Sequence, residues 1–283
     1  MKQFALVLVH LMLLSAISIS RSYAAPVPAQ LRVLRTPKKG ETTKMKGGCS
    51  DARIAKLEEA LGFARELANS AAEELSKDGA ELSEGVQTWL GPVNRGTLRV
   101  QVAKRFTSVA RNLGAPLKQV LREPTKGETA LLFHCQEQGC SDSLAMTQNK
   151  GSTSKFNQIQ LCPLFFKGGL DQDIAAYTAK KNAGKRNKFR SPTNARELVI
   201  LLLSSMLVIL VFQQQSYTLL HEAQHSLALL GSSKARDNLQ DFTHAAGNTP
   251  QACHELQGVS KALNAENWAL VAFLIKADPA RFA

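Results

Sequence analysis

Three residues in the C-terminal third of the chain, His221, Glu222 and His225, have the types and spacing of a metal-dependent hydrolytic centre, because they form the pattern H-E-x-x-H. On an α-helix, residues four apart lie above one another on the same face, so both imidazoles can bind one metal ion. A carboxylate beside that ion can take a proton from a water molecule on the metal. The pattern therefore predicts one Zn²⁺ ion bound by His221 and His225, with Glu222 as the general base.

A catalytic zinc ion needs a third protein ligand, because such sites keep their fourth position open for water. We expect Asp241 to supply that ligand, since it follows the helix at a distance that lets the chain turn back over it. Asp237 lies close by in the sequence and is an alternative. Glu255 and Glu266, on later segments, are the candidates if the third ligand is a glutamate.

The segment from Ser216 to Gly231 has the pattern of the helix that would position the two histidines. The side chain of Ser216 suits the N-terminal cap, and Gly231 suits the C-terminal stop. An apolar stripe at helical spacing would face the protein core. This stripe consists of Leu220, Ala223, Leu227 and Leu230.

The N-terminus has the features of a secretory signal peptide. Lys2 provides a positive charge, an almost unbroken apolar run extends from Phe4 to Ile19, and Ser22-Tyr23-Ala24 forms a small-x-small cleavage site. We therefore expect residues 1–24 to be removed and the protein to be secreted to the extracellular space.

The next stretch, residues 25–48, is rich in Pro, Gly, Thr, Lys and Arg and shows no periodicity, which predicts a flexible leader or pro-segment. Lys38-Lys39 offers a dibasic processing site there, although a plain linker is the simpler interpretation. The folded domain is then expected to span residues 49–283.

The helical pattern is strongest in residues 51–77, where apolar residues recur at alternating spacings of three and four. Ser50 or Asp51 would cap this long amphipathic helix. A second helix is expected in residues 98–121, interrupted by Pro116.

Strand patterns occur in the middle of the chain. Residues 129–134 and 157–166 are short and apolar, and Gly, Ser and Asn flank them. Residues 140–155 are polar and predict a loop between the two strands. His134 is interpreted as an ordinary strand histidine. Together these patterns predict an α+β fold that is mainly helical with a small sheet.

The five cysteines all follow the expected cleavage point, which suits disulfides in an oxidising compartment. An odd number leaves one cysteine over, and the sequence permits many connectivities. By their places, Cys140 and Cys162 would tie a loop to a strand, and Cys49 and Cys135 would tie the first helix to the sheet.

Charge and hydropathy limit the partners. The formal net charge is +12, but no basic stripe is interleaved with aromatic residues, so we expect no nucleic-acid partner. Basic residues in 180–190 predict an exposed loop, whereas residues 198–212 are apolar. A membrane span needs about 20 such residues, which favours a buried helix or strand over membrane insertion. Residues 180–215 could also be an insertion in the gene model.

The order of these features resembles the deuterolysin-like, or aspzincin, metallopeptidases, which are secreted mostly by fungi. It resembles to a lesser degree the related secreted fungal zinc-binding antigens. The matching pieces are Cys49-Ser50 at the start of the long helix, Cys135 and Cys140 before a strand, residues 159–166, residues 218–225 and residues 262–270.

The resemblance implies a zincin-like fold for residues 49–283, and it places Asp241 near the aspartate ligand of that family. The family motif around this ligand is G-T-x-D-x-x-Y-G, whereas this chain has Asn238-Leu239 and His244-Ala245 at the corresponding places. The family tyrosine resembles an electrophilic helper at the scissile carbonyl. In this chain, the loss of the tyrosine would leave His244 to take that role, or would leave the activity reduced.

These observations predict a secreted, monomeric zinc endopeptidase that acts on polypeptides, with Glu222 as catalytic base and His221, His225 and Asp241 as metal ligands. The rival prediction is a secreted zinc-binding surface or interaction protein that does not cleave. Glu222 favours the enzyme, because a binding protein has no need of a general base. The altered surroundings of Asp241 favour the binding protein.

Overall fold

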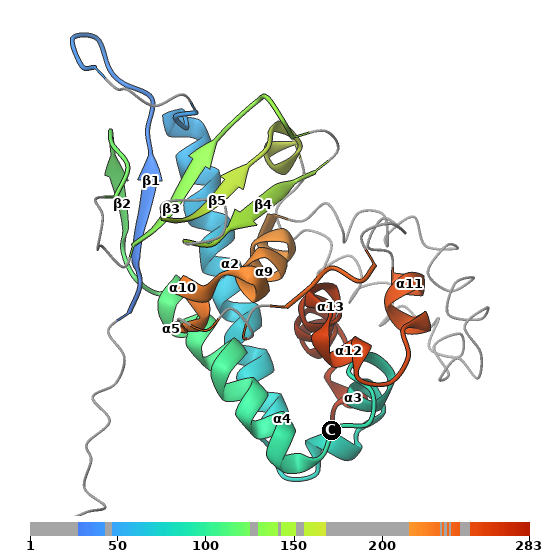
Figure 1. Cartoon of the computed structure of the whole chain (residues 1–283). Coiled ribbons are helices and arrows are strands. Elements are labelled where there is room, and N and C mark those ends of the chain that lie inside the picture. The colour runs from blue at the N-terminus through green and yellow to red at the C-terminus, as the bar shows by residue number, and fades with distance from the viewer. Residues whose placement is uncertain are drawn as a thin grey trace, which may run out of the picture.

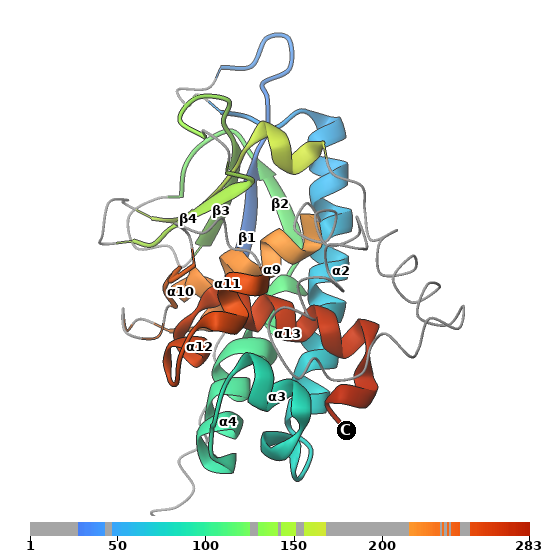
Figure 2. The same ribbon diagram turned by 90° about the vertical axis from the view of Figure 1, so that its right-hand side faces the viewer.

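Five strands form one sheet, and a long helix packs against one face of it (Figure 1). Below the sheet, further helices form a second layer, and α2 runs along both parts (Figures 1 and 2). The computed structural model describes residues 28–42, 47–124, 130–140, 143–150, 156–167, 215–232, 234, 237, 239–243 and 250–283. The expected mixture of helices with a small sheet is confirmed.

The sheet has the strand order β2-β1-β3-β5-β4. β4 is antiparallel to β5 and lies at one edge, whereas the other neighbouring pairs are parallel. The strands are β1 (Gln30–Leu34), β2 (Leu117–Val120), β3 (Ala130–Cys135), β4 (Ala145–Gln148) and β5 (Asn157–Leu161).

The expectation of a flexible leader in residues 25–48 is wrong for β1, which is an inner strand between β2 and β3. Leu31 and Val33 are buried against the helices, and Leu34 packs on the opposite face of the sheet. The alternation of apolar and polar residues from Leu31 to Val33 suits a strand. It is short, however, and the residues around it are polar and include proline, so no strand was predicted there. The folded domain therefore begins before Cys49.

The first long helix is confirmed as α2 (Asp51–Leu75). The Ser50 side chain accepts a hydrogen bond from the Arg53 backbone N–H and so caps it, as expected. Its buried face contains Ile54, Leu57 and Leu61 at the predicted spacings of three and four. Helix α2 therefore provides the long apolar surface on which the sheet and the later helices pack.

The second helical region is shorter than expected. It consists of α4 (Arg95–Val102), a π-helical turn η2 (Ala103–Thr107) and α5 (Ser108–Leu113). Pro116 follows its end, and the next residues form β2 rather than more helix. Between α2 and α4 lie η1 (Ala80–Leu82) and α3 (Glu84–Trp89).

The polar loop expected in residues 140–155 is wrong for β4. This strand has only one buried residue, Ala145, and its remaining side chains are partly exposed, so it lacks the apolar content of a typical strand. The strand expected in residues 157–166 ends at Leu161, because Pro163 begins the short helix η3 (Pro163–Phe166).

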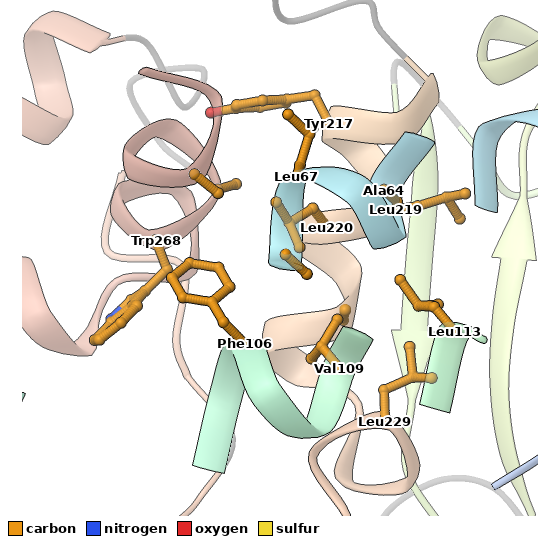
Figure 3. Close-up of a cluster of buried hydrophobic side chains, with 14 of the residues drawn as sticks. Ala64, Leu67, Phe106, Val109, Leu113, Tyr217, Leu219, Leu220, Leu229 and Trp268 are labelled. Carbon is orange, nitrogen blue, oxygen red and sulfur yellow. The ribbon is translucent and has the colours of Figure 1, made fainter. Parts of the chain in front are cut away.

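The C-terminal part adds helices that pack on α2 and beside the sheet. They are α9 (Gln215–His225), α10 (Leu227–Leu230), α11 (Pro250–Glu255), α12 (Ser260–Leu263), α13 (Ala265–Ala277) and η7 (Pro279–Arg281). Helices α2, α9 and α13 contact one another. Figure 3 shows the apolar cluster at their junction, to which belong Ala64, Leu67, Phe106, Val109, Leu219, Leu220 and Trp268.

Two disulfides join the positions expected from the sequence, Cys49 to Cys135 and Cys140 to Cys162. Cys253 is the remaining cysteine and is buried. No helix in the described ranges is long and apolar enough to cross a membrane. The expected signal peptide, the basic segment 180–190 and the apolar segment 198–212 lie outside the described residues.

Candidate metal centre

Helix α9 holds both histidines of the H-E-x-x-H pattern. All its residues from Gln215 to Gln224 are buried, because the helix is enclosed by α2, α13 and β4. The boundaries differ slightly from those expected, since α9 already includes Ser216 and stops at His225. Ser226 then adopts an extended conformation and caps α10, whose end is closed by Gly231 in the left-handed conformation.

Three ligand atoms meet at one point, which is formed by His221, His225 and Asp241. The Nε2 atoms of the two histidines are 3.2 Å apart. The Oδ1 atom of Asp241 is 3.3 Å from Nε2 of His221 and 3.1 Å from Nε2 of His225. Ligands about 2.0–2.1 Å from a tetrahedral zinc ion are separated from one another by about 3.3 Å. The three distances therefore fit three corners of a zinc tetrahedron.

Both imidazoles are turned so that Nε2 faces this point. The Nδ1 atom of His225 is 2.8 Å from the backbone oxygen of Leu239, and a carbonyl oxygen can only accept a hydrogen bond. This contact therefore places the proton on Nδ1 and leaves Nε2 unprotonated for a metal. The Nδ1 atom of His221 is 2.6 Å from a carboxylate oxygen of Glu266. Ligand histidines in metal sites commonly contact a carboxylate or a carbonyl group in this way.

Glu266 is itself held in place from a second side. The phenol of Tyr217, one turn before His221 on α9, donates a hydrogen bond of 2.5 Å to the other oxygen of the Glu266 carboxylate. Burial, together with the negative charge of Glu266, raises the pKa of Tyr217 well above its ordinary value, so the phenol keeps its proton. Glu266 therefore lies between a fixed donor and the first histidine of the motif.

The electrostatic environment favours a cation at the centre. Burial alone would lower the pKa of His221, but the carboxylates of Glu266, Glu222 and Asp241 outweigh burial and raise that pKa to about 10. The same negative field that favours a proton on His221 would attract a divalent metal ion. The site thus has the charge as well as the spacing of a cation site.

Strand β4 and the residue after it fix the end of α9. The Thr147 hydroxyl donates to the backbone oxygen of Glu222 at 3.1 Å. The Asn149 amide donates to the backbone oxygen of His225 at 2.7 Å and accepts from the Leu227 N–H at 2.9 Å. Asn149 thus satisfies backbone groups on both sides of the break at Ser226. The sequence offered no signal for this contact, because Asn149 lay in an expected loop.

The alternative third ligands lie elsewhere. Asp237 accepts a hydrogen bond from the Ser232 hydroxyl at 2.6 Å and has an ion-pair contact with Lys104 at 3.6 Å. Glu255 lies on α11 and does not belong to the group of converging ligand atoms. His244, the expected helper at the carbonyl, lies outside the described residues.

Glu222, the expected general base, is buried next to His221 on α9. Within the described part of the chain, its carboxylate takes part in no hydrogen bond, although its backbone oxygen accepts from Thr147. A carboxylate that is not engaged by neighbouring donors can accept a proton from a bound water molecule.

No protein-family model matches the sequence, and no curated protein matches it. Among solved structures, a zinc peptidase from Grifola frondosa is similar, with a TM-score of 0.48 and 13% sequence identity. The match covers 80% of this chain and 97% of that chain. A likeness at this level does not carry function from one protein to the other.

Proposed function

We propose that this chain is a secreted zinc endopeptidase with a zincin-like fold. The observation that carries the proposal is the convergence of His221, His225 and Asp241 at distances that suit tetrahedral zinc, with Glu222 on the same helix. Two histidines and one carboxylate are a common set of three protein ligands in catalytic zinc sites.

The chemistry divides between the ion and the chain. When bound, zinc would polarise the scissile carbonyl and lower the pKa of a water molecule to about 7. Glu222 would take a proton from the attacking water and give it to the departing amine, so one carboxylate would serve as base and then as acid. His221 and His225 hold their Nε2 atoms toward the reaction because Glu266 and Leu239 engage the opposite ring nitrogens.

Two further parts of the proposal concern the substrate. We propose that His244 contacts the oxygen of the scissile carbonyl and is a second polar partner of that oxygen beside the ion. The position of β4 supports the proposal of a polypeptide substrate. This strand lies at the edge of the sheet, and the side chain of its Thr147 is hydrogen-bonded to α9. An edge strand presents backbone groups with which an extended peptide can pair.

The proposal is tested by digestion of casein with the purified protein and with its Glu222→Gln variant, each with and without a zinc chelator. We expect the untreated wild type to cleave casein, and we expect no cleavage by the chelator-treated protein or by Glu222→Gln. Added zinc should restore cleavage by the chelator-treated wild type. Glu222→Gln keeps the size of the side chain and should still bind zinc. Cleavage that persists with the chelator, or in Glu222→Gln, would contradict the mechanism.

A second function, zinc binding without cleavage, is favoured by one observation. The sequence around Asp241 lacks the tyrosine that the resemblance leads one to expect, and His244 stands there instead. Stoichiometric zinc binding by a wild type that cleaves no peptide bond would assign this function to the chain.

A further inference from the structure

Asn264 lies where α12 meets α13, is fully buried, and is bonded to the segment that carries Asp241. Its side-chain oxygen accepts a hydrogen bond of 2.9 Å from the backbone N–H of Phe242. Its amide group donates to the Thr243 hydroxyl at 3.3 Å and to the side-chain oxygen of Asn267 at 2.7 Å. Asn264 thus contacts both residues that follow Asp241.

The residue before Asp241 is held by the same junction. The backbone N–H of Gln240 donates to the oxygen of Leu263 at 3.1 Å, and the oxygen of Gln240 accepts from the N–H of Ala265 at 3.0 Å. The peptide groups on both sides of Asp241 are therefore attached to residues 263–265. One step earlier, the N–H of Leu239 donates to the oxygen of Gln224 on α9 at 3.1 Å.

We propose that Asn264 is a positioning residue for the third metal ligand, and this inference rests on the proposed zinc site. Asp241 lies in an irregular segment, so no helix or strand fixes the direction of its carboxylate. The bond from Phe242 to Asn264 prevents the backbone on the far side of Asp241 from rotating. Partners that orient a ligand contribute strongly to metal affinity, because a displaced ligand binds the ion poorly.

Asn267 provides a matched control. It is also a fully buried asparagine, and its amide group donates to the backbone oxygens of Trp89 at 2.6 Å and Cys253 at 3.2 Å. Replacing it removes these bonds and the bond that its side-chain oxygen accepts from the Asn264 amide, but it does not remove the acceptor of the Phe242 N–H, which is the side-chain oxygen of Asn264. A loss of stability alone should thus affect both positions, whereas a loss of ligand orientation should affect only Asn264.

The test measures the zinc dissociation constant of the full-length protein by competition with a chromophoric chelator. We expect Asn264→Ala to weaken zinc binding about 10–100-fold and Asn267→Ala to change it less than about threefold. The visible absorption of the cobalt-substituted protein should change in Asn264→Ala and stay as in the wild type in Asn267→Ala. Equal zinc affinity in Asn264→Ala and the wild type, or equal losses in both alanine variants, would overturn the inference.

Asn264→Asp provides a second measurement, which also covers failure of the alanine variant to fold. The aspartate retains an oxygen that can accept from Phe242 but cannot donate to Thr243 or Asn267. We expect its zinc affinity to stay within about tenfold of that of the wild type, and a complete loss would contradict the assigned role. A wild type that binds no zinc would refute the metal site itself, whereas a zinc-binding wild type with an unaffected Asn264→Ala would refute only the positioning role.

Discussion

At the scale of single residues, Glu266 joins the first histidine of the motif to the core of the protein. Its carboxylate contacts Nδ1 of His221 and accepts a hydrogen bond from Tyr217. We expect Glu266→Gln to weaken zinc binding about 10–100-fold, because an amide holds the imidazole less strongly than a carboxylate does. Isothermal titration with zinc measures this change.

Glu255→Gln is the control for that substitution, since it removes one negative charge from α11, outside the group of ligand atoms. Its zinc affinity should match that of the wild type. If the two glutamine variants lose the same affinity, total charge rather than contact with His221 controls metal binding.

The two aspartates of the segment after α10 differ in their surroundings. We therefore expect their replacement by asparagine to affect zinc binding differently. Asp241→Asn should reduce the zinc content of the purified protein by at least about tenfold, because a neutral amide replaces the negatively charged carboxylate among the converging ligand atoms. Asp237→Asn should retain zinc, since Asp237 contacts Ser232 and Lys104 instead. Metal analysis after dialysis distinguishes them, and the reverse result would make Asp237 the third ligand.

The sequence could predict some parts of this site and not others. The two histidines and Glu222 form a local pattern whose geometry follows from the helix alone. Spacing put Asp241 first but could not exclude Asp237, because an irregular segment has no fixed period. The contact of Glu266 with His221 depends on how α13 packs against α9, and no local pattern contains that information.

At the scale of elements, a substitution in β1 can test whether this segment is a strand of the folded core or a leader that can be removed. Leu31 is 1% exposed and packs in the main core. We expect Leu31→Ala to lower the free energy of unfolding by about 3 kcal/mol, because it leaves a cavity in that core. Urea unfolding followed by circular dichroism measures the loss.

Arg32→Ala is the neighbouring control, because this partly exposed side chain lies on the opposite face of β1. It should cost less than about 1 kcal/mol. Unchanged stability in Leu31→Ala would show that β1 is not part of the folded core in solution.

Three short strands, β1, β2 and β4, were not predicted, and the physical reason is the same for each. β1, β2 and β4 have four or five residues each, and in β2 and β4 most side chains are partly or fully exposed. Pairing with a neighbouring strand, rather than an apolar pattern of their own, stabilises such strands. Helix α2, by contrast, repeats its apolar spacing over many turns and was predicted almost to its last residue.

At the scale of the whole molecule, stability should depend on pH through His134. This histidine is 5% exposed, and among the residues that the structure describes neither of its ring nitrogens has a hydrogen-bond partner. Burial lowers its pKa to about 4, from about 6.5 in an unfolded chain. As pH falls below 6.5, the unfolded state takes up a proton that the folded state does not, so the folded state loses stability until about pH 4.

Because of His134, we expect the free energy of unfolding to decrease by about 2 kcal/mol when the pH is lowered from 7.5 to 5. Chemical denaturation at the two pH values measures this difference. His134→Leu removes the titrating group and keeps an apolar side chain, so its stability should change less over the same range. An equal pH dependence in both proteins would assign the effect to other groups.

The mixed architecture could be predicted from helix periodicity and strand patterns. The places of the cysteines suggested the two observed pairs, although the sequence left other connectivities open. The strand order could not be predicted, since β1 lies between two strands that follow it much later in the chain. Such pairings depend on the complete tertiary structure.

The inner position of β1 has a consequence for proteolysis at Lys38-Lys39. Both lysines are exposed in the loop that projects from the sheet after β1 (Figure 1). A cut there would leave β1 hydrogen-bonded to β2 and β3 although its covalent link to α2 is lost. The product would be a nicked, two-chain protein with an undiminished sheet. Its two chains would separate under denaturing electrophoresis but migrate together in a native gel.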